Sequence, residues 1–336
     1  MSMQARVIRQ THNLFNLAKA LSFMKQIKKC DLCGKSDFSL LYRNSDRMIR
    51  GNNAQFSVVK CRHCNLVFLN PQPSEKELQK YYPKKEYYSL KKNSVEDLKL
   101  YLYKIFQDSR FSIKKILFYP MKPFLRGIKI IPGGNILDIG CGDGKFLEIV
   151  RQRGMNCYGV DPFAENRNKN GIKIIRGNLK QAHFKSNFFD VITINHTFEH
   201  VSNPSETLKE IRRILKPGGI LILATPNIES FASRIFKKYW FQLDTPRHLF
   251  LYSKKTLLRY AKKEGLECIT KRYTSTPLQF LVSLQYQLNP ENKPLSEFKR
   301  KILDNRLLFV LLLPLAYLVN LMHSGDQLEI YLRKKK

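Results

Sequence analysis

The residues of this chain best suited to chemistry form a glycine-rich turn, Asp138-Ile139-Gly140-Cys141-Gly142-Asp143-Gly144. Apolar Ile136 and Leu137 precede the turn, and residues 145–150 after it have a helical composition. This order predicts a buried strand, a tight turn and a helix. Glycine at every second position lets backbone N–H groups approach a ligand without a Cβ between them, and the helix directs its positive end to the same place. The turn therefore predicts a site for an adenosine-bearing cofactor.

The spacing of the glycines distinguishes between such cofactors. A nicotinamide-binding turn has the pattern G-x-G-x-x-G, whereas Gly140, Gly142 and Gly144 alternate with single residues. Asp161 ends the next short apolar stretch, 21 residues after Gly140. A βαβ unit places an acid at this separation over the ribose hydroxyls. We therefore expect Asp161 to bind a ribose, and we do not expect a nicotinamide cofactor.

The elements that must position these residues alternate along the middle of the chain. After the strand that ends at Leu137, strands are predicted at residues 155–161, 172–178, 189–195, 220–225, 265–270 and 326–333. Asn203-Pro204-Ser205-Glu206 predicts the capped start of an intervening helix. Alternation of this kind predicts an α/β fold with a doubly wound, mostly parallel, seven-stranded sheet. Ligands of such sheets bind at the carboxyl ends of the strands, where the turn and Asp161 lie.

Residues 131–275 resemble the class I S-adenosylmethionine-dependent methyltransferases at three segments. These are the glycine turn, Asn195-His196-Thr197-Phe198-Glu199-His200-Val201 and Lys216-Pro217-Gly218-Gly219. The resemblance implies a Rossmann-like core with an antiparallel last strand, and it implies roles for the polar residues. Gly140, Gly142, Gly144 and Asp138 would hold the amino acid part of S-adenosylmethionine, Asp161 the ribose and Asn178 the adenine, while Asn195 would border the methyl group. The alternative is a plain tight turn with no ligand.

Histidines supply the candidate general bases. Methyl transfer to a hydroxyl needs one proton removed, and a histidine of near-neutral pKa suits that task. His196 is the first candidate because it follows the fourth strand at the reactive end of the cofactor. His248 is the second, because the resemblance implies that residues 240–250 lie over the substrate. We expect His200 to be structural and bonded to backbone. Quinone methyltransferases carry E-M-L-E-H here, some with a divalent ion, but His196 replaces the first Glu, so we do not expect that ion.

The second chemical pattern is a pair of C-x2-C motifs, with Cys30 and Cys33 in the first and Cys61 and Cys64 in the second. Two turns that each direct two thiolates at one point suit tetrahedral zinc with a closed shell, so the metal would be structural. Gly34 after the first pair and Asn65 after the second suit the turns of zinc knuckles. The alternatives are disulfides and a redox role for one pair. No export signal is visible, which favours reduced cysteines and a cytoplasmic protein.

The segment around the second pair also resembles a family. A zinc knuckle that ends in C-x-L-V-F-L-N-P-x-P, here residues 64–73, precedes the methyltransferase core in bacterial enzymes that methylate sugars, polysaccharides or related precursors. The predicted parts are a basic N-terminal helix (1–29), a zinc ribbon (30–73), a helical linker or substrate cap (74–130), the core (131–275), an apolar insertion (276–323) and the final strand of the core (324–336).

The apolar insertion and the net positive charge indicate what kinds of partner to expect. Residues 307–322 are apolar, contain Pro314 and are too short for a bilayer span of about 20 residues. They predict either contact with an anionic membrane surface, peripheral at its inner face, or a helix packed on the core or on a second copy. The formal net charge of +32 attracts polyanions, but the basic residues are spread along the chain.

These patterns together predict an S-adenosylmethionine-dependent methyltransferase with an N-terminal zinc ribbon. The expected acceptor is a small molecule or a glycan or lipid-linked precursor, methylated on oxygen. One alternative is an RNA methyltransferase whose ribbon grips RNA, which the charge favours and the apolar insertion disfavours. Another is a membrane-associated binding protein without activity, which the intact glycine turn disfavours.

Overall fold

The computed structural model describes most of the chain. The described residues are 24–48, 54–82, 101–102, 105–106, 112–118, 125, 128–289 and 306–335. Most of the predicted N-terminal helix, much of the predicted linker and residues 290–305 of the predicted insertion therefore lie outside the described residues.

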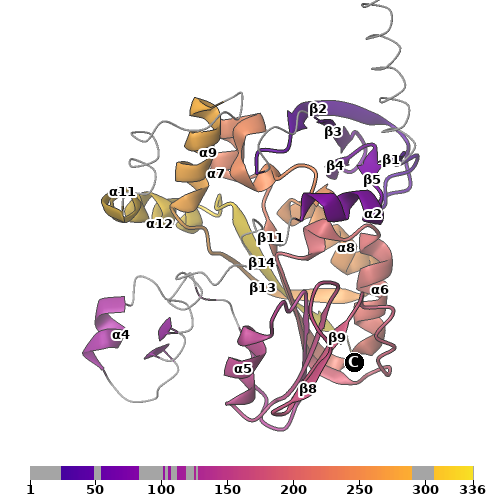
Figure 1. The fold of residues 1–336 in the computed structure, drawn as a ribbon, viewed down its shortest axis with the longest axis vertical. Coiled ribbons are helices and arrows are strands. Elements are labelled where there is room, and N and C mark those ends of the chain that lie inside the picture. The colour runs from indigo at the N-terminus through magenta and orange to yellow at the C-terminus, as the bar shows by residue number, and fades with distance from the viewer. Residues whose placement is uncertain are drawn as a thin grey trace, which may run out of the picture.

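An eight-stranded sheet forms the centre of the molecule, in the order β13-β14-β11-β10-β6-β7-β9-β8 (Figure 1). The strands are β6 (Asn135–Ile139), β7 (Asn156–Asp161), β8 (Arg167–Lys169), β9 (Ile172–Arg176), β10 (Phe189–Asn195), β11 (Leu215–Pro226), β13 (Leu266–Tyr273) and β14 (Gln327–Lys334). The five central strands pair in parallel, and β14 lies antiparallel between β11 and β13. This order is that of a class I methyltransferase fold, and it confirms the predicted fold class.

The sheet differs from the prediction at two places. The predicted seven strands omit β8, a short edge strand antiparallel to β9. The predicted fifth strand starts at residue 220, whereas β11 starts at Leu215, because Leu215 already pairs with Phe189, before an irregularity in the register. Strand order reverses between β6 and β10, and in open α/β sheets the ligand binds at such a reversal.

Helices cover both faces of this sheet, with α5 (Lys145–Arg151) on one side and α6 (Pro204–Ile214) and α8 (Lys254–Lys263) on the other (Figure 1). Leu208, Ile211 and Ile214 recur at helical spacing in α6 and are buried. The predicted cap by Asn203 is wrong, since its side chain makes no cap hydrogen bond. Instead, Ser205 N donates to Asp31 Oδ2 at 3.0 Å, so a carboxylate from the N-terminal part caps α6.

A second sheet carries the cysteine pairs, and one of its strands comes from the core. Its order is β12-β4-β3-β2, where β2 is Phe38–Ser45, β3 Gln55–Cys61, β4 Val67–Leu69 and β12 Phe250–Leu251. Phe250 pairs with Phe68 and Leu251 with Val67. The predicted ribbon and core therefore share backbone hydrogen bonds and a continuous apolar core.

A buried ion network fastens the same two parts together. Arg247 is fully buried and donates to Asp46 Oδ1 and Oδ2 at 2.9 and 3.0 Å, and to Asp244 Oδ1 at 3.0 Å. Burial alone would lower the pKa of the Arg247 guanidinium, but Asp244 and Asp46 raise it above its usual value. Arg247 Nη1 also donates to Tyr81 O at 3.2 Å, so the buried cation is surrounded by acceptors.

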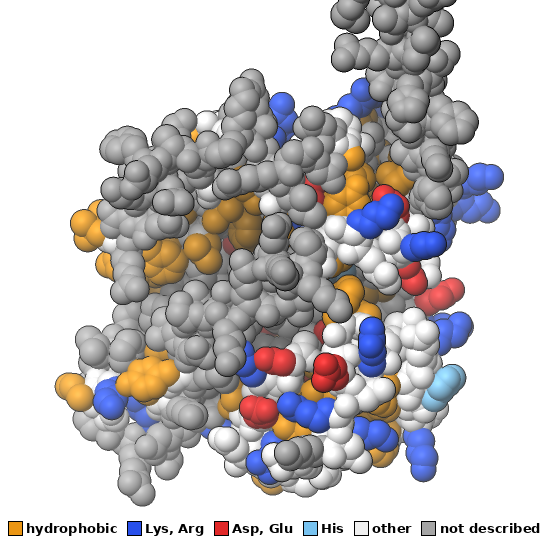
Figure 2. All heavy atoms as spheres, viewed as in Figure 1, with side chains coloured by type: hydrophobic (Ala, Val, Ile, Leu, Met, Phe, Trp, Pro, Cys, Tyr) orange, Lys and Arg blue, Asp and Glu red, His pale blue; other side chains and the backbone are white. Residues whose placement is uncertain are grey.

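The described part of the predicted apolar insertion is helical and partly exposed. It comprises α9 (Leu278–Leu288), α11 (Arg306–Leu311) and α12 (Leu313–Leu321). Apolar side chains gather on the surface of α11 and α12 in Figure 2, with Leu307, Leu311 and Leu321 each more than 60% exposed. Among the described residues, no helix is long and apolar enough to cross a membrane.

We predict that Asp46→Asn lowers the free energy of unfolding by about 3 kcal/mol, because it leaves a buried guanidinium short of one counter-charge. Urea denaturation of the full chain measures this change. Glu77→Gln is the matched control, since Glu77 pairs with the exposed Lys80, and such pairs contribute less than about 1 kcal/mol. Equal effects of the two substitutions would contradict the assigned role of Asp46.

Candidate functional site

The glycine turn links the end of β6 to the start of α5 at the strand reversal. Gly140, Gly142 and Gly144 all have positive φ, at 76°, 53° and 81°. A Cβ on Gly140 would collide with the Thr197 side chain, and one on Gly144 would lie 2.7 Å from Ile174 Cδ1. A Cβ on Gly142 would meet nothing within 4 Å, so this glycine borders open space. Two glycines are therefore required by packing, and the central one leaves room for a ligand.

Two buried acids, Asp161 and Asp138, accept hydrogen bonds at the turn and at the strand before it. Asp161, at the end of β7, accepts from Gly142 N at 3.0 Å and from Phe163 N at 2.7 Å, which joins the turn to the next strand. Asp138, on β6, accepts from Thr193 Oγ1 of β10 at 2.7 Å and is buried. This hydrogen bond joins β6 and β10, the two strands that flank the reversal. Ala164 N also donates to Asp161 Oδ1 at 3.2 Å, so the free acceptor site of this carboxylate is on Oδ2, and that site suits one ribose hydroxyl of S-adenosylmethionine.

Two asparagines complete the predicted cofactor residues. Asn195 ends β10, beside the glycine turn, and its carbonyl accepts from Thr197 Oγ1. Asn178 lies past β9, where it is exposed and exchanges hydrogen bonds with Gln181. The structure thus brings Asn195 to the turn, and it places Asn178 on the next loop along the same edge. Their roles toward the cofactor stay predictions.

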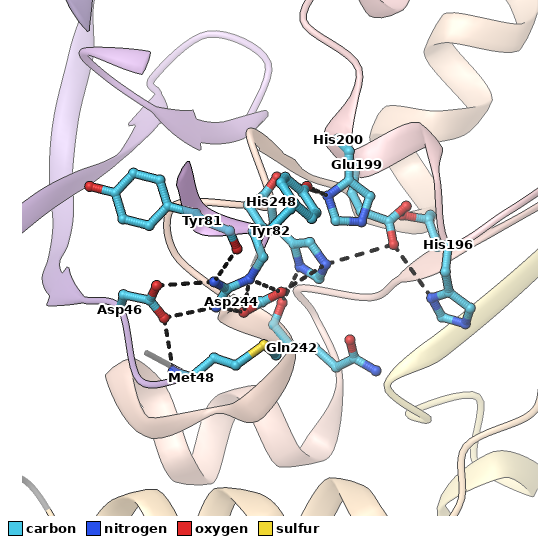
Figure 3. Close-up of polar contacts among 12 residues, drawn as sticks. Asp46, Met48, Tyr81, Tyr82, His196, Glu199, His200, Gln242, Asp244 and His248 are labelled. Atoms are coloured by element: carbon cyan, nitrogen blue, oxygen red, sulfur yellow. Dashed lines mark hydrogen bonds and ion pairs between the residues drawn. The ribbon is translucent and has the colours of Figure 1, made fainter. Parts of the chain in front are cut away.

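Histidines and acids form a row just past the end of β10 (Figure 3). His196 has positive φ, and its Nδ1 lies 3.4 Å from Glu199 Oε1 in the 3-10 turn η4 (Phe198–His200). His248 Nε2 lies 3.9 Å from the same oxygen, and its Nδ1 lies 2.7 Å from Gln242 O. The two candidate bases therefore flank one buried carboxylate.

The electrostatics of this row follow from burial and charge. Burial alone would raise the pKa of Glu199, but the hydrogen bond and charge of His196, with His200 and His248, lower it to about 2. Burial and the charge of His248 lower the pKa of His200 to about 4, so this ring is neutral at pH 7. His200 Nδ1 also lies 2.9 Å from Arg247 O and 3.0 Å from the Tyr82 hydroxyl. The expected backbone bond of His200 is thus present.

Three residues of this row are also placed as metal ligands would be. Ligand atoms of Glu199, His200 and His248 lie within 4.8 Å of one another, so their number and spacing are compatible with a cation. The His200 and His248 rings already use Nδ1 for the backbone carbonyls of Arg247 and Gln242. Their free nitrogens and the Glu199 carboxylate would be the ligands, and His196 lies outside the group.

The four predicted zinc ligands lie together. Cys30 Sγ is 3.4 Å from Cys64 Sγ, and Cys33 Sγ is 3.6 Å from Cys61 Sγ. Sulfurs on a tetrahedral zinc at about 2.3 Å are separated by about 3.8 Å, so the four thiols fit this ion. Gly34 and Asn65 both have positive φ, and their N–H groups donate to Cys30 O and Cys61 O. Burial raises the pKa of Cys64 to about 11.

A family model described as "Methyltransferase domain" matches residues 113–271. This segment of the chain is a methyltransferase domain. The ubiquinone biosynthesis O-methyltransferase of Azoarcus sp. (strain BH72) is 29% identical over 162 residues, 42% of this chain and 67% of that protein. The demethylmenaquinone methyltransferase of Geobacillus stearothermophilus is 32% identical over 141 residues, 37% of this chain and 59% of that protein. A solved S-adenosylmethionine-dependent methyltransferase from Mesorhizobium loti is 16% identical with a TM-score of 0.41, over 61% of this chain and 93% of that one.

Each of these alignments covers only part of this chain and part of the relative. The chain spans 46–67% of the length of three curated relatives, which include the ubiquinone biosynthesis O-methyltransferase of Pseudomonas aeruginosa (strain UCBPP-PA14), 34% identical over 107 residues, 29% of this chain. The methyltransferase domain contains the glycine turn, both acids and both histidines. The four cysteines lie before it.

Sequence reasoning missed several residues of the methyltransferase domain that the structure brings together. Glu199 stands three residues after His196, and that i, i+3 spacing was the available signal. Asp244 and Arg247 show the same spacing, but their partner Asp46 lies 201 residues before Arg247. Nothing in the local pattern around Asp46 indicates that pairing.

We predict that Gly142→Ala abolishes binding of S-adenosylhomocysteine while the free energy of unfolding falls by only about 1 kcal/mol, the cost of a left-handed alanine. Its Cβ would occupy the open space beside the turn. Calorimetry and urea denaturation measure the two quantities. Gly133→Ala is the matched control, since Gly133 also has positive φ and nothing within 4 Å, so it should keep binding. Unchanged binding by the Gly142 variant would contradict the cofactor assignment.

Proposed function

We propose that this chain transfers a methyl group from S-adenosylmethionine to a small-molecule, glycan or lipid-linked acceptor, on oxygen. The observation that carries the proposal is the open turn at Gly142, joined by a hydrogen bond to Asp161 at the strand reversal. The bound sulfonium would supply an already activated methyl group. The protein's own task is then to hold the acceptor in line, exclude water and accept one proton.

His196 is the residue we assign to that proton. Its Nδ1 faces the Glu199 carboxylate, which favours the tautomer with the proton on Nδ1 and leaves Nε2 as the base. Glu199 is fully buried and ionised, so it also stabilises the imidazolium formed when the acceptor hydroxyl loses its proton. His248 is the second candidate, but its side chain is only 3% exposed and its Nε2 faces Glu199 and Asp244.

The class of acceptor rests on three observations. Curated relatives include quinone methyltransferases, which supports a small organic acceptor. The exposed apolar side chains of α11 and α12 support contact with a membrane surface or a lipid-linked acceptor. The net charge of +32 supports the second candidate function, methylation of RNA.

A labelled-methyl assay on sugar-nucleotide, lipid and RNA fractions of a bacterial lysate tests these acceptor classes. With the acceptor found, His196→Ala should lower kcat by about 10²–10⁴-fold and keep binding of S-adenosylhomocysteine, because only the base is lost. His248→Ala should also lower kcat if it shares this role. His183→Ala, at an exposed position away from the row, is the control. Wild-type rates for both the His196 and His248 variants would refute the assignment, and label in RNA alone would favour the second function.

We also propose that Cys30, Cys33, Cys61 and Cys64 hold a structural zinc ion. Support comes from the sulfur separations and from the paired knuckle turns. Four thiolates leave no open coordination position, so the ion would order the chain and would not act on substrate. Asp31, between the first two cysteines, also caps α6, so the ion would steady a contact with the core.

Zinc removal should therefore loosen the N-terminal part. We predict that Cys33→Ser lowers the zinc content of the purified protein and its thermal midpoint, because the apoprotein loses its cross-link. Elemental analysis and thermal unfolding measure these effects. Cys268→Ser, at an exposed cysteine outside the cluster, is the control and should leave both unchanged. Full zinc occupancy in the Cys33 variant would contradict this ligand set.

A further inference from the structure

Tyr82 connects the N-terminal part of the chain to two loops of the methyltransferase domain. It directly follows the 3-10 turn η1 (Gln79–Tyr81) and therefore lies before that domain, residues 113–271. Its ring centroid is 5.4 Å from that of Phe163, at an interplanar angle of 37°. Its hydroxyl lies 3.0 Å from His200 Nδ1 (Figure 3). One side chain thus contacts a residue just after β7 and a residue just after β10.

The order of the strands places these contacts on either side of the glycine turn. Strand β6 lies between β7 and β10 in the sheet, and the turn follows the end of β6. Neighbouring strands are about 4.8 Å apart, so β7 and β10 are separated by about 10 Å, a distance that one tyrosine and its two contacts can span. A side chain that joins the loops after β7 and β10 therefore passes across the end of β6, where Gly142 borders open space.

Phe163 brings the same contact to the predicted ribose site. Its N–H donates to Asp161 Oδ1 at 2.7 Å, which fixes the backbone of Phe163 beside this acid. The Phe163 side chain is still 48% exposed although it packs on Tyr82, which is itself half-buried. The two rings therefore have apolar surface left over next to Asp161, and such a surface suits the flat faces of an adenosine.

The hydrogen bond with His200 fixes the position of the Tyr82 hydroxyl. Arg247 O can only accept, and it lies 2.9 Å from His200 Nδ1, so this nitrogen bears the hydrogen of the neutral ring. Tyr82 Oη is therefore the acceptor of its contact with His200. Because Arg247 also forms the buried ion network, the place of Tyr82 is set by the junction between the N-terminal part and the core.

We propose that Tyr82 covers bound S-adenosylmethionine between Asp161 and His200, as a positioning residue supplied by the N-terminal part. This assignment rests on the proposed methyl transfer. Together with Phe163, the Tyr82 ring closes the open side of the glycine turn and keeps water from the activated methyl group. Tyr82 takes no proton, and the chemistry stays with the row at the end of β10.

The affinity for S-adenosylhomocysteine, measured by calorimetry on the full chain, tests this role. Tyr82→Ala should weaken binding about 10-fold, because the ring no longer packs on the ligand and on Phe163. Tyr82→Phe keeps the ring and should bind within about 3-fold of the wild type, since only one hydrogen bond to His200 is lost. This rescue by phenylalanine separates the cover from a role of the hydroxyl.

Tyr42→Ala is the matched control for the loss of a tyrosine. Tyr42 lies on β2 in the same N-terminal part and is also half-buried against the core. Its loss should lower the melting temperature and leave the affinity for S-adenosylhomocysteine unchanged. A Tyr82→Ala variant that behaves like this control, with a lower melting temperature and wild-type affinity, would show that Tyr82 only stabilises the fold, and it would overturn the proposal.

Phe163→Ala gives a second test that leaves the N-terminal part intact, because the Phe163 side chain is half exposed. This substitution should also weaken binding about 10-fold. In the double variant with Tyr82→Ala, the loss should be smaller than the product of the two single losses, since residues in contact act together. A full product would contradict a cover that the two rings share.

The outcomes separate this proposal from the proposed function. If the wild-type protein binds S-adenosylhomocysteine and Tyr82→Ala binds it equally well, the cover is refuted and methyl transfer stands. Binding by Tyr82→Phe as weak as that by Tyr82→Ala also refutes the cover, because the hydroxyl and not the ring would then be required. If the wild-type protein does not bind S-adenosylhomocysteine, methyl transfer is refuted and the cover with it.

Discussion

The buried cation of Arg247 is the interaction on which the rest of this structure depends. It is fully enclosed and bonded to Asp46 from the N-terminal part and to Asp244 from the core. A charge with no access to water is stable only while every partner stays in place, so the two parts of the chain must remain docked. Strand β12 and the cap of α6 by Asp31 add directional bonds to the same junction.

This junction connects directly to the row of candidate catalytic groups. Asp244 lies between Arg247 and His248, and Arg247 O is bonded to His200. Burial would raise the pKa of Asp244, but Arg247 and His248 lower it, so it stays ionised. The row of His196, Glu199, His200 and His248 is thus held from two sides, by the sheet edge and by the docked N-terminal part. A metal at the four cysteines would act on the site through this rigid contact.

The carboxyl edge of the sheet holds groups of two kinds. Asp161 is satisfied within the protein by backbone amides of the turn and of the residues after β7, so it supports a preformed loop. Glu199, which follows β10, is buried, and its Oε1 faces His196 and His248 instead. The first carboxylate shapes the cofactor turn, and the second places negative charge between the two candidate bases.

Local pattern determined much of this protein. Apolar runs located β6, β7, β9 and β10 because parallel strands are buried on both faces, and the alternate glycines located the turn because only glycine tolerates its close contacts. The spacing of the cysteines likewise placed four sulfurs together. Only the tertiary structure decided the short edge strand β8, the pairing of β12 with β4, the replacement of the Asn203 cap by Asp31, and the meeting of Asp46 with Arg247. These contacts join residues far apart in the chain or have too few residues for a periodic signal, so their energy comes from burial and geometry that no local pattern carries.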